Sequence, residues 1–110
     1  MLKLLRLFVP VIFAGMVVLP AMGAGDPEKG KDLYMKRCKS CHAEDGAGTP
    51  AMQKKFGEKL LPLGGKEVQA MKDAEITRKF NEAANHKALL KTLQPGDLEN
   101  LIAFIRTLKK

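Results

Sequence analysis

The clearest pattern of apolar and polar positions lies at the end of the chain. Apolar residues recur there every three or four positions: Leu98, Leu101, Ile102, Ile105 and Leu108. That spacing places them on one face of an amphipathic helix. Pro95 suits the first position of such a helix, and Lys109 and Lys110 suit its end, where the helix dipole favours cations. The sequence therefore predicts a final helix that starts at Pro95 and buries one face in a core.

A second helix is predicted early in the chain. Asp26, Pro27 and Glu28 favour, in turn, the N-cap, the first position and the first turn of a helix. Between them and Cys38, Gly30 is the main residue that weakens a helix. We therefore expect a helix that begins at Pro27 and continues to about Cys38.

The middle of the chain combines a third helical pattern with an irregular stretch. Between Asp73 and Ala84, the residues Ile76, Phe80 and Ala83 lie on one face at helical spacing. Residues 43–66 hold five glycines and two prolines, which predicts a loop with one short helical piece. No segment shows the strict alternation of a half-buried strand. The predicted fold class is therefore all-α.

The first 23 residues have the layout of a secretory signal peptide. Lys3 and Arg6 form a short basic start, Leu7–Leu19 is almost wholly apolar, and Ala21 and Gly23 are small residues suited to a cleavage site. Cleavage is expected after residue 23, with residues 24 and 25 as alternatives. An uncleaved membrane anchor is the other alternative, but a span needs about 20 apolar residues, and prolines and a glycine interrupt this stretch. We therefore expect an exported, periplasmic protein.

Removal of the signal peptide changes the composition of what folds. The full chain has 110 residues, a formal net charge of +7 and 45% hydrophobic residues. Residues 24–110 form a chain of 87 residues. The removed segment contains two cations, Lys3 and Arg6, and no acidic residue, so the net charge falls from +7 to +5. A chain of this size forms one small domain with a modest core. It is too short for a TIM barrel, a full Rossmann dehydrogenase or a protein kinase.

The residues that carry chemistry are concentrated in Cys38-Lys39-Ser40-Cys41-His42. A C-x-x-C-H run is typical of the attachment site of c-type haem. Two thiols three positions apart can reach the two vinyl groups on one edge of a porphyrin and form thioether bonds. His42 is then directed at the iron from one face. Export agrees with this interpretation, because c-type haem is attached outside the cytoplasm in bacteria.

Other uses of the two cysteines fit the sequence less well. A C-x-x-C pair also occurs in zinc sites and in thioredoxin-like redox motifs. A zinc site would need two ligands besides the two cysteines. Outside the C-x-x-C-H run, the sequence offers only His86 as a Cys or His ligand. A thioredoxin-like motif needs strands, and a disulfide across three positions would close a small loop and stabilise little. One covalently bound haem c, with its iron, is therefore the predicted cofactor.

With these residues in view, the sequence resembles the small, single-haem class I cytochromes c over most of the predicted domain. Gly30, Tyr34 and the C-x-x-C-H residues have the spacing of that family's first helix and haem site. Leu98, Leu101 and Phe104 resemble its last helix. The resemblance implies three to four helices around the haem. It also implies that the first and last helices cross at Gly30, with Tyr34 and Phe104 packed beside the crossing.

The resemblance also suggests a role for Pro50. The family often has a proline after the haem motif whose carbonyl accepts a hydrogen bond from the haem-ligating imidazole. Such a bond orients the ligand and raises its basicity. Pro50 lies eight residues after His42, so its carbonyl could accept this bond, or it could simply be a loop proline.

The residue on the other side of the iron determines the kind of cytochrome. In the family it is usually a methionine between the middle and last helices, and His–Met ligation raises the reduction potential. Residues 85–94 contain no methionine, and His86 occupies the expected position. We expect His86 as this second axial ligand and a potential below that of His–Met relatives, since imidazole is the stronger donor. Met71, Met52 and an open or water-ligated iron are the alternatives.

An iron with two protein ligands exchanges electrons and has no vacant position for a substrate. The sequence also shows no constellation suited to acid–base catalysis. We therefore predict an electron carrier and not an enzyme. Two alternatives stay open: a haem-binding subunit of a larger oxidoreductase, and a gas-binding or enzymatic haem protein with an open sixth position.

Basic residues gather around the haem motif and in the loop after it: Lys36, Arg37, Lys39, Lys54, Lys55 and Lys59. Such a cluster can steer a redox partner with an acidic docking surface, in an encounter that is weak and salt-sensitive. A transient contact with a membrane complex is also open, and we expect a monomer. Nucleic acid is not an expected partner, because no basic patch carries stacking aromatics.

Overall fold

The computed structural model describes residue 15 and residues 25–110. The predicted signal peptide and its cleavage site therefore lie almost wholly outside the described residues. Within the described part of the chain, no helix is long and apolar enough to cross a membrane.

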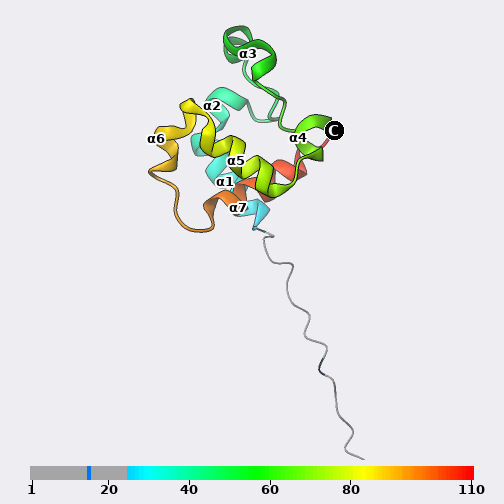
Figure 1. Ribbon diagram of the computed structural model, residues 1–110, viewed down its shortest axis with the longest axis vertical. Helices are drawn as coiled ribbons and strands as arrows, with labels where there is room; N and C mark the ends of the chain where they lie inside the picture. Colours follow the sequence, from blue (N-terminus) through cyan, green and yellow to red (C-terminus); the bar gives the residue numbers. More distant parts are fainter. Residues whose placement is uncertain (1–14, 16–24) are drawn as a thin grey trace, which may run out of the picture.

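Residues 25–110 fold into helices joined by turns and contain no strand (Figure 1). In chain order the elements are α1 (Pro27–Arg37), α2 (Lys39–His42), α3 (Pro50–Phe56), η1 (Gly57–Lys59), α4 (Lys66–Ala70), α5 (Asp73–Glu82), η2 (Ala84–His86), α6 (Lys87–Leu90) and α7 (Asp97–Thr107). The all-α prediction is confirmed. The three longest helices, α1, α5 and α7, are those that the apolar pattern predicts, and the others add only short pieces to them.

The boundaries of the helices follow the predicted caps except at α7. The carboxylate of Asp26 caps α1, as predicted. Helix α7 begins at Asp97 and not at Pro95, because Gly96 adopts a φ of 89° and turns the chain. The backbone N–H of Asp97 donates to the carbonyl of Gln94 over 3.0 Å, and the Asp97 carboxylate accepts from the Gln94 N–H over 2.8 Å. The prediction of Pro95 as a first helical residue is therefore wrong.

Helix α1 crosses α7 in the most extensive helix pairing of the described chain. A Cβ atom at Gly30 would overlap the backbone carbonyl of Asn100, so the glycine permits the two backbones to approach. The rings of Tyr34 and Phe104 pack beside the crossing with centroids 5.0 Å apart. The predicted crossing at Gly30 is confirmed.

Helix α7 contributes to both buried clusters of the described residues. Their members are Tyr34, Leu101 and Phe104 in one and Val68, Ile76 and Ile102 in the other. The first cluster joins α7 to α1, and the second joins it to α4 and α5. The apolar stripe predicted for the last helix therefore organises the whole core.

Arg106 of α7 ties α4 and α5 to this core. Its guanidinium donates to the carbonyls of Val68, Gln69 and Met71. It also pairs with the carboxylate of Asp73, with a nitrogen–oxygen distance of 2.6 Å. Asp73 is the first residue of α5, so one side chain holds the end of α4 and the start of α5 against α7.

The Gly- and Pro-rich stretch contains more helix than a single short piece. Thr49 caps α3, whose first residue is Pro50, and η1 follows directly. Figure 1 shows α3 at one extremity of the folded part, away from α7. After α5, the segment predicted as a ligand loop forms η2 and α6.

Candidate cofactor site

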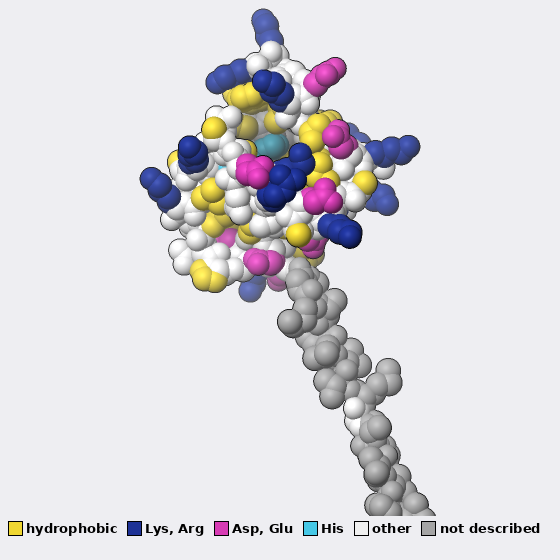
Figure 2. All heavy atoms as spheres, viewed as in Figure 1, with side chains coloured by type: hydrophobic (Ala, Val, Ile, Leu, Met, Phe, Trp, Pro, Cys, Tyr) yellow, Lys and Arg dark blue, Asp and Glu magenta, His cyan; other side chains and the backbone are white. Residues whose placement is uncertain are grey.

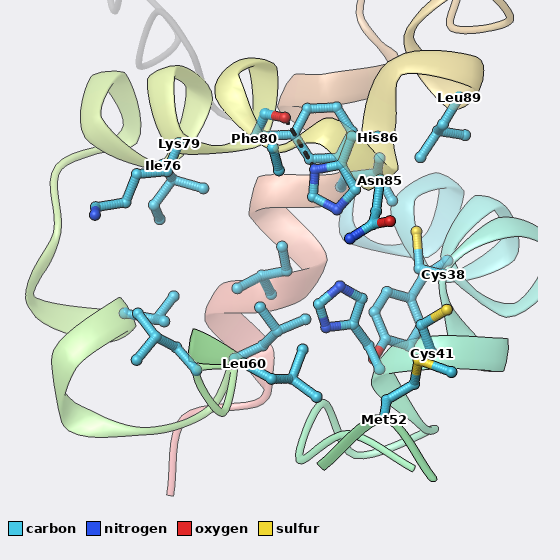
Figure 3. A pocket seen from close by; sticks show the side chains of 18 of the residues that line it. Cys38, Cys41, Met52, Leu60, Ile76, Lys79, Phe80, Asn85, His86 and Leu89 are labelled. Atoms are coloured by element: carbon cyan, nitrogen blue, oxygen red, sulfur yellow. Dashed lines mark hydrogen bonds between the residues drawn. The ribbon is translucent and has the colours of Figure 1, made fainter. Parts of the chain in front are cut away.

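A cavity of about 730 Å³ lies between the motif residues and the end of α5. All the predicted site residues line it: Cys38, Cys41, His42, His86, Met52 and Met71. The rest of the wall is mostly apolar, with leucines, isoleucines and Phe80 from α5, α7 and the segment after α3 (Figure 3). Figure 2 shows a histidine side chain at the bottom of a hollow in the surface. Cofactor cavities in proteins are typically about 300–1,000 Å³, so the size fits a large flat cofactor.

The two cysteines lie on one short helical turn. Helix α1 ends at Arg37, Cys38 caps both α1 and α2, and the backbone N–H of His42 donates to the Cys38 carbonyl over 2.9 Å. Cys38 is half-buried, Cys41 is exposed, and both thiols are free. Residues three apart on a helical turn share a face, so both thiols border the same cavity.

The environment of the thiols argues against a reactive redox pair. Burial, with a smaller contribution from Cys41, raises the pKa of the Cys38 thiol to about 11. Reactive cysteines have lowered pKa values, because the thiolate is the nucleophile. Zinc is disfavoured as well: within the described residues, no three His, Cys, Asp or Glu side chains are grouped as a metal site. Of the roles considered for Cys38 and Cys41, thioether attachment of a group with vinyl substituents is the one that both thiols fit.

His42 is the last residue of α2, and its Nδ1 atom is buried without a hydrogen-bond partner. Burial, with a smaller contribution from His86, lowers the pKa of the His42 imidazole. The ring is therefore neutral at neutral pH, which is the form that binds a metal. Because Nδ1 has no partner, the structure does not contain the hydrogen bond to the Pro50 carbonyl that was one of the two roles considered for this proline. Pro50 instead begins α3 after the Thr49 cap.

His86 is held by the end of α5. Its Nδ1 lies 2.9 Å from the carbonyl oxygen of Phe80, and its ring stacks on the Phe80 ring with centroids 4.3 Å apart. A carbonyl can only accept, so Nδ1 carries a proton, and Nε2 is the ring nitrogen left to bind a metal. In Figure 3 the ring nitrogen that does not face Phe80 points into the cavity. A hydrogen bond of this kind typically orients metal-binding histidines.

The two imidazole rings face each other across the cavity, with centroids 6.2 Å apart and planes tilted by 40°. An imidazole nitrogen binds a transition metal at about 2.0–2.1 Å and lies about 1.1 Å from its ring centroid, so two imidazoles on opposite sides of one metal have centroids about 6.3 Å apart. The separation of His42 and His86 therefore fits one metal ion between them. The tilt is compatible, because both ring planes can contain the common axis.

The two methionines differ in their surroundings. Met71 packs against the buried cluster of Val68, Ile76 and Ile102, and its carbonyl accepts from Arg106. Met52 lies on α3, at the extremity of the fold. Both border the cavity, as the two histidines do, and the separation of the histidine rings matches a shared metal.

Some residues of the site have no signature in the sequence. The hydrogen bond to His86 comes from a main-chain carbonyl, which any residue at position 80 would offer. The apolar pattern does place Phe80 on the inner face of its helix, but it does not indicate the contact with His86. Arg37 and Lys79 also border the cavity, together with Lys55 and Lys59.

An all-α fold with the two thiols and the histidine of a C-x-x-C-H run on one helical turn beside a large apolar cavity is typical of c-type haem proteins. The chain matches the Cytochrome c family model over residues 27–109 and belongs to the cytochrome c family. No curated protein and no solved structure gave a match. Members of this family carry covalently bound haem c with its iron and generally serve in electron transfer, and Cys38 and Cys41 fit the attachment motif.

Proposed function

We propose that this protein is an exported electron carrier in which His42 and His86 hold the haem iron from opposite sides. The observation that carries the proposal is the pair of imidazole rings 6.2 Å apart, across a cavity bordered by both motif cysteines. The proposal of export rests on the basic, apolar and small-residue order of residues 1–23.

Each part of the site has a distinct task. When bound, haem c supplies an iron that exchanges one electron between its ferric and ferrous states. The thiols of Cys38 and Cys41 hold the cofactor by thioether bonds. With haem bound, the imidazoles of His42 and His86 would hold the iron from both sides and leave no position for a substrate or a gas. This occupancy supports a carrier over an enzyme or a gas-binding protein.

The axial pair also sets the direction of the reduction potential. Axial ligation tunes haem potentials over a range of roughly 0.8 V. An imidazole donates more electron density than a thioether and therefore favours the ferric state. The hydrogen bond from His86 Nδ1 to the Phe80 carbonyl adds to this donation. We expect a potential below that of His–Met relatives.

The rim of the cavity supports an acidic redox partner. Four cationic side chains border the opening, Arg37, Lys55, Lys59 and Lys79, against one acidic side chain, Glu82. Figure 2 shows Lys and Arg side chains on the surface around the hollow, with acidic side chains among them. Charge of one sign around a site raises the rate of encounter with the opposite sign, and salt screens it. We propose a transient complex with an acidic surface, formed by the monomer.

The rim can be tested with hexacyanoferrate(III), an anionic oxidant that takes one electron from the reduced protein. We expect Lys59→Glu to slow the oxidation severalfold at low ionic strength and to make little difference at high salt. Lys66→Glu is the matched control, because Lys66 is exposed on α4 and does not border the cavity. If both substitutions slowed the oxidation equally, the rate would depend on net charge alone, and this would contradict a docking surface at the cavity rim.

Spectra of the purified holoprotein test the axial pair. We expect a low-spin spectrum in both redox states, slow binding of carbon monoxide, and a rise in potential for His86→Met. Met71→Leu and Met52→Leu are the controls and should leave potential and spectrum unchanged. If His86→Met changes neither, His86 does not bind the iron. Immediate carbon monoxide binding by the unmodified protein would favour the gas-binding or enzymatic alternative, and co-purification with another polypeptide would favour the subunit alternative.

A further inference from the structure

Ala43, which directly follows His42, has an unusual backbone conformation. Its φ is 64° and its ψ is 169°, and it is the one non-glycine residue with a positive φ in the described chain. This region of backbone space is essentially restricted to glycine, because a Cβ atom clashes with the neighbouring peptide groups. Such a conformation persists only where surrounding contacts hold it.

Hydrogen bonds hold the peptide groups on both sides of Ala43. Its N–H donates to the carbonyl of Lys39 over 2.9 Å, and the carbonyl of His42 accepts from the N–H of Gly48 over 2.7 Å. The carbonyl of Ala43 accepts from the hydroxyl of Tyr34 over 2.5 Å. The Tyr34 bond is the one that comes from another helix, α1.

Tyr34 is well placed to act as a fixed anchor. Its side chain is 1% exposed, and its ring packs on Phe104 at the α1–α7 crossing. Burial raises the pKa of its hydroxyl far above the usual range, with smaller contributions from Cys38 and Asp45, so the proton that the bond to Ala43 needs is retained. The anchor therefore belongs to the most extensively packed part of the fold.

The conformation of Ala43 matters because the His42 ring lacks its own anchor. The Nδ1 atom of His86 donates to a carbonyl, whereas the Nδ1 atom of His42 has no partner. The direction of the His42 ring therefore depends on the main chain that carries it. The positive φ of Ala43 ends α2 directly after His42 and sends the chain back towards Cys41, whose carbonyl accepts from the N–H of Thr49 over 3.0 Å.

We propose that Tyr34 is a positioning residue for His42: its buried hydroxyl holds the strained Ala43 backbone and so keeps the His42 ring directed across the cavity. This inference rests on the proposed role of His42 as an iron ligand. It assigns to Tyr34 a task beyond packing at the helix crossing.

The main test compares the holoproteins of the unmodified chain and Tyr34→Phe, which keeps the ring and removes the hydroxyl. Carbon monoxide can bind the reduced iron only when an axial imidazole leaves, so its binding rate reports how firmly the imidazoles are held. We expect Tyr34→Phe to raise this rate at least fivefold. Adding Ala43→Gly should bring the rate back to within twofold of the unmodified protein, because glycine adopts the same φ without strain.

Phe104→Leu is the matched control. It weakens the packing of the Tyr34 ring but keeps the hydroxyl bond, so it should lower the midpoint of guanidinium unfolding and leave the carbon monoxide rate within twofold. An unchanged rate in Tyr34→Phe, or no recovery with Ala43→Gly, overturns the positioning role. So does a rate in Phe104→Leu as high as in Tyr34→Phe, because general loosening would then explain both.

Failure of the proposed function has a different signature. If the unmodified reduced protein binds carbon monoxide at once, the iron is open on the His86 side and the axial pair is wrong. The iron–imidazole stretching band in the resonance Raman spectrum of the reduced protein then reports on His42 alone, and a band unchanged by Tyr34→Phe overturns the positioning role. If Tyr34→Phe yields no holoprotein, Ala43→Gly alone is measured. It should raise the unfolding midpoint by relieving the strain, and an unchanged or lower midpoint overturns the proposal.

Discussion

The two histidines that border the cavity are fixed by different means. The ring of His86 has a hydrogen bond to the Phe80 carbonyl and a stacking contact with the Phe80 ring. The ring of His42 has no hydrogen bond at Nδ1 and depends on a backbone that is held at Ala43. One imidazole is therefore oriented through its side chain, and the other through its main chain.

The supports behind the two histidines differ as well. The His42 side rests on the crossing of α1 and α7, where two backbones are in contact at Gly30. On the other side, His86 contacts the end of α5, and Arg106 of α7 binds the start of α5. Damage to the crossing should therefore disrupt the whole fold, whereas damage to the α5 side should release His86 first.

The largest effect is expected for Gly30→Val. Its side chain would overlap the Asn100 carbonyl, a backbone atom that cannot move aside without separating α1 from α7. We expect a loss of at least about 4 kcal/mol in the free energy of unfolding, in the range reserved for disrupted cores. Guanidinium unfolding and the yield of holoprotein measure it.

Gly65→Ala is the matched control for this substitution. Gly65 has an ordinary φ of −76°, and a Cβ atom there would lie 3.2 Å from the carbonyl oxygen of Pro62, a small adjustment. We expect a change in the free energy of unfolding of at most about 1 kcal/mol. If the two glycine substitutions destabilised equally, the close approach at Gly30 would not be the support of the His42 side.

Arg106→Leu is the next largest expected effect, on the opposite side. It removes the hydrogen bonds to the carbonyls of Gln69 and Met71 and the pair with Asp73. Hydrogen bonds to charged groups contribute about 1.5–3 kcal/mol each, less where solvent screens them, so we expect a loss of about 2–4 kcal/mol. The carbon monoxide rate of the reduced protein should rise together with this loss, because α5 carries the contacts of His86.

Arg106→Lys separates charge from geometry in the same position. A lysine keeps the charge near Asp73 but cannot reach several carbonyls with one planar group. We expect it to retain less than half of the stability that Arg106→Leu removes. If the carbon monoxide rate stayed constant while stability fell in both variants, the contacts of Arg106 with α4 and α5 would not help to hold His86 in place.

The sequence predicts those parts of the fold and site that depend on neighbouring residues. The Asp26 cap, the α7 stripe and the contiguous C-x-x-C-H run are local signals, and the structure contains the first two as predicted. His86 could be found because its place between two predicted helices is also a matter of order along the chain. Whether it binds the iron stays a prediction.

The remaining features depend on contacts that leave no local pattern. Arg106 binds Asp73, which is 33 residues earlier, and Phe80 contributes a main-chain carbonyl that any residue would have. The left-handed backbone of Ala43 contradicts the preference of alanine, so no propensity could indicate it. Pro50 shows the converse: a proline suits the start of α3 as well as a loop, so the sequence left its role open, and the structure places it at the start of α3.

Phe80→Leu tests the side-chain anchor of His86 with a smaller perturbation. The main-chain carbonyl stays in place, so the hydrogen bond to Nδ1 remains, while the stacking contact at 4.3 Å is lost. Aromatic contacts are worth about 0.5–1.5 kcal/mol beyond their buried area, so we expect a loss of about 1 kcal/mol in the free energy of unfolding. The carbon monoxide rate should rise by less than in Arg106→Leu. A larger rise would make the stacking contact with Phe80, and not the contacts of Arg106 with α5, the main support of His86.

The smallest effect is expected on the outer face of the same helix, for Arg78→Gln. Arg78 pairs with Glu82 one turn further along α5, with a nitrogen–oxygen distance of 3.3 Å, and both side chains are more than half exposed. Exposed pairs at this spacing contribute about 0.3–0.5 kcal/mol and are screened by salt. We expect a change of this size at low ionic strength, none at 1 M salt, and an unchanged carbon monoxide rate. A rate that rose with Arg78→Gln would mean that the helicity of α5 as a whole, and not its inner contacts alone, holds His86 in place.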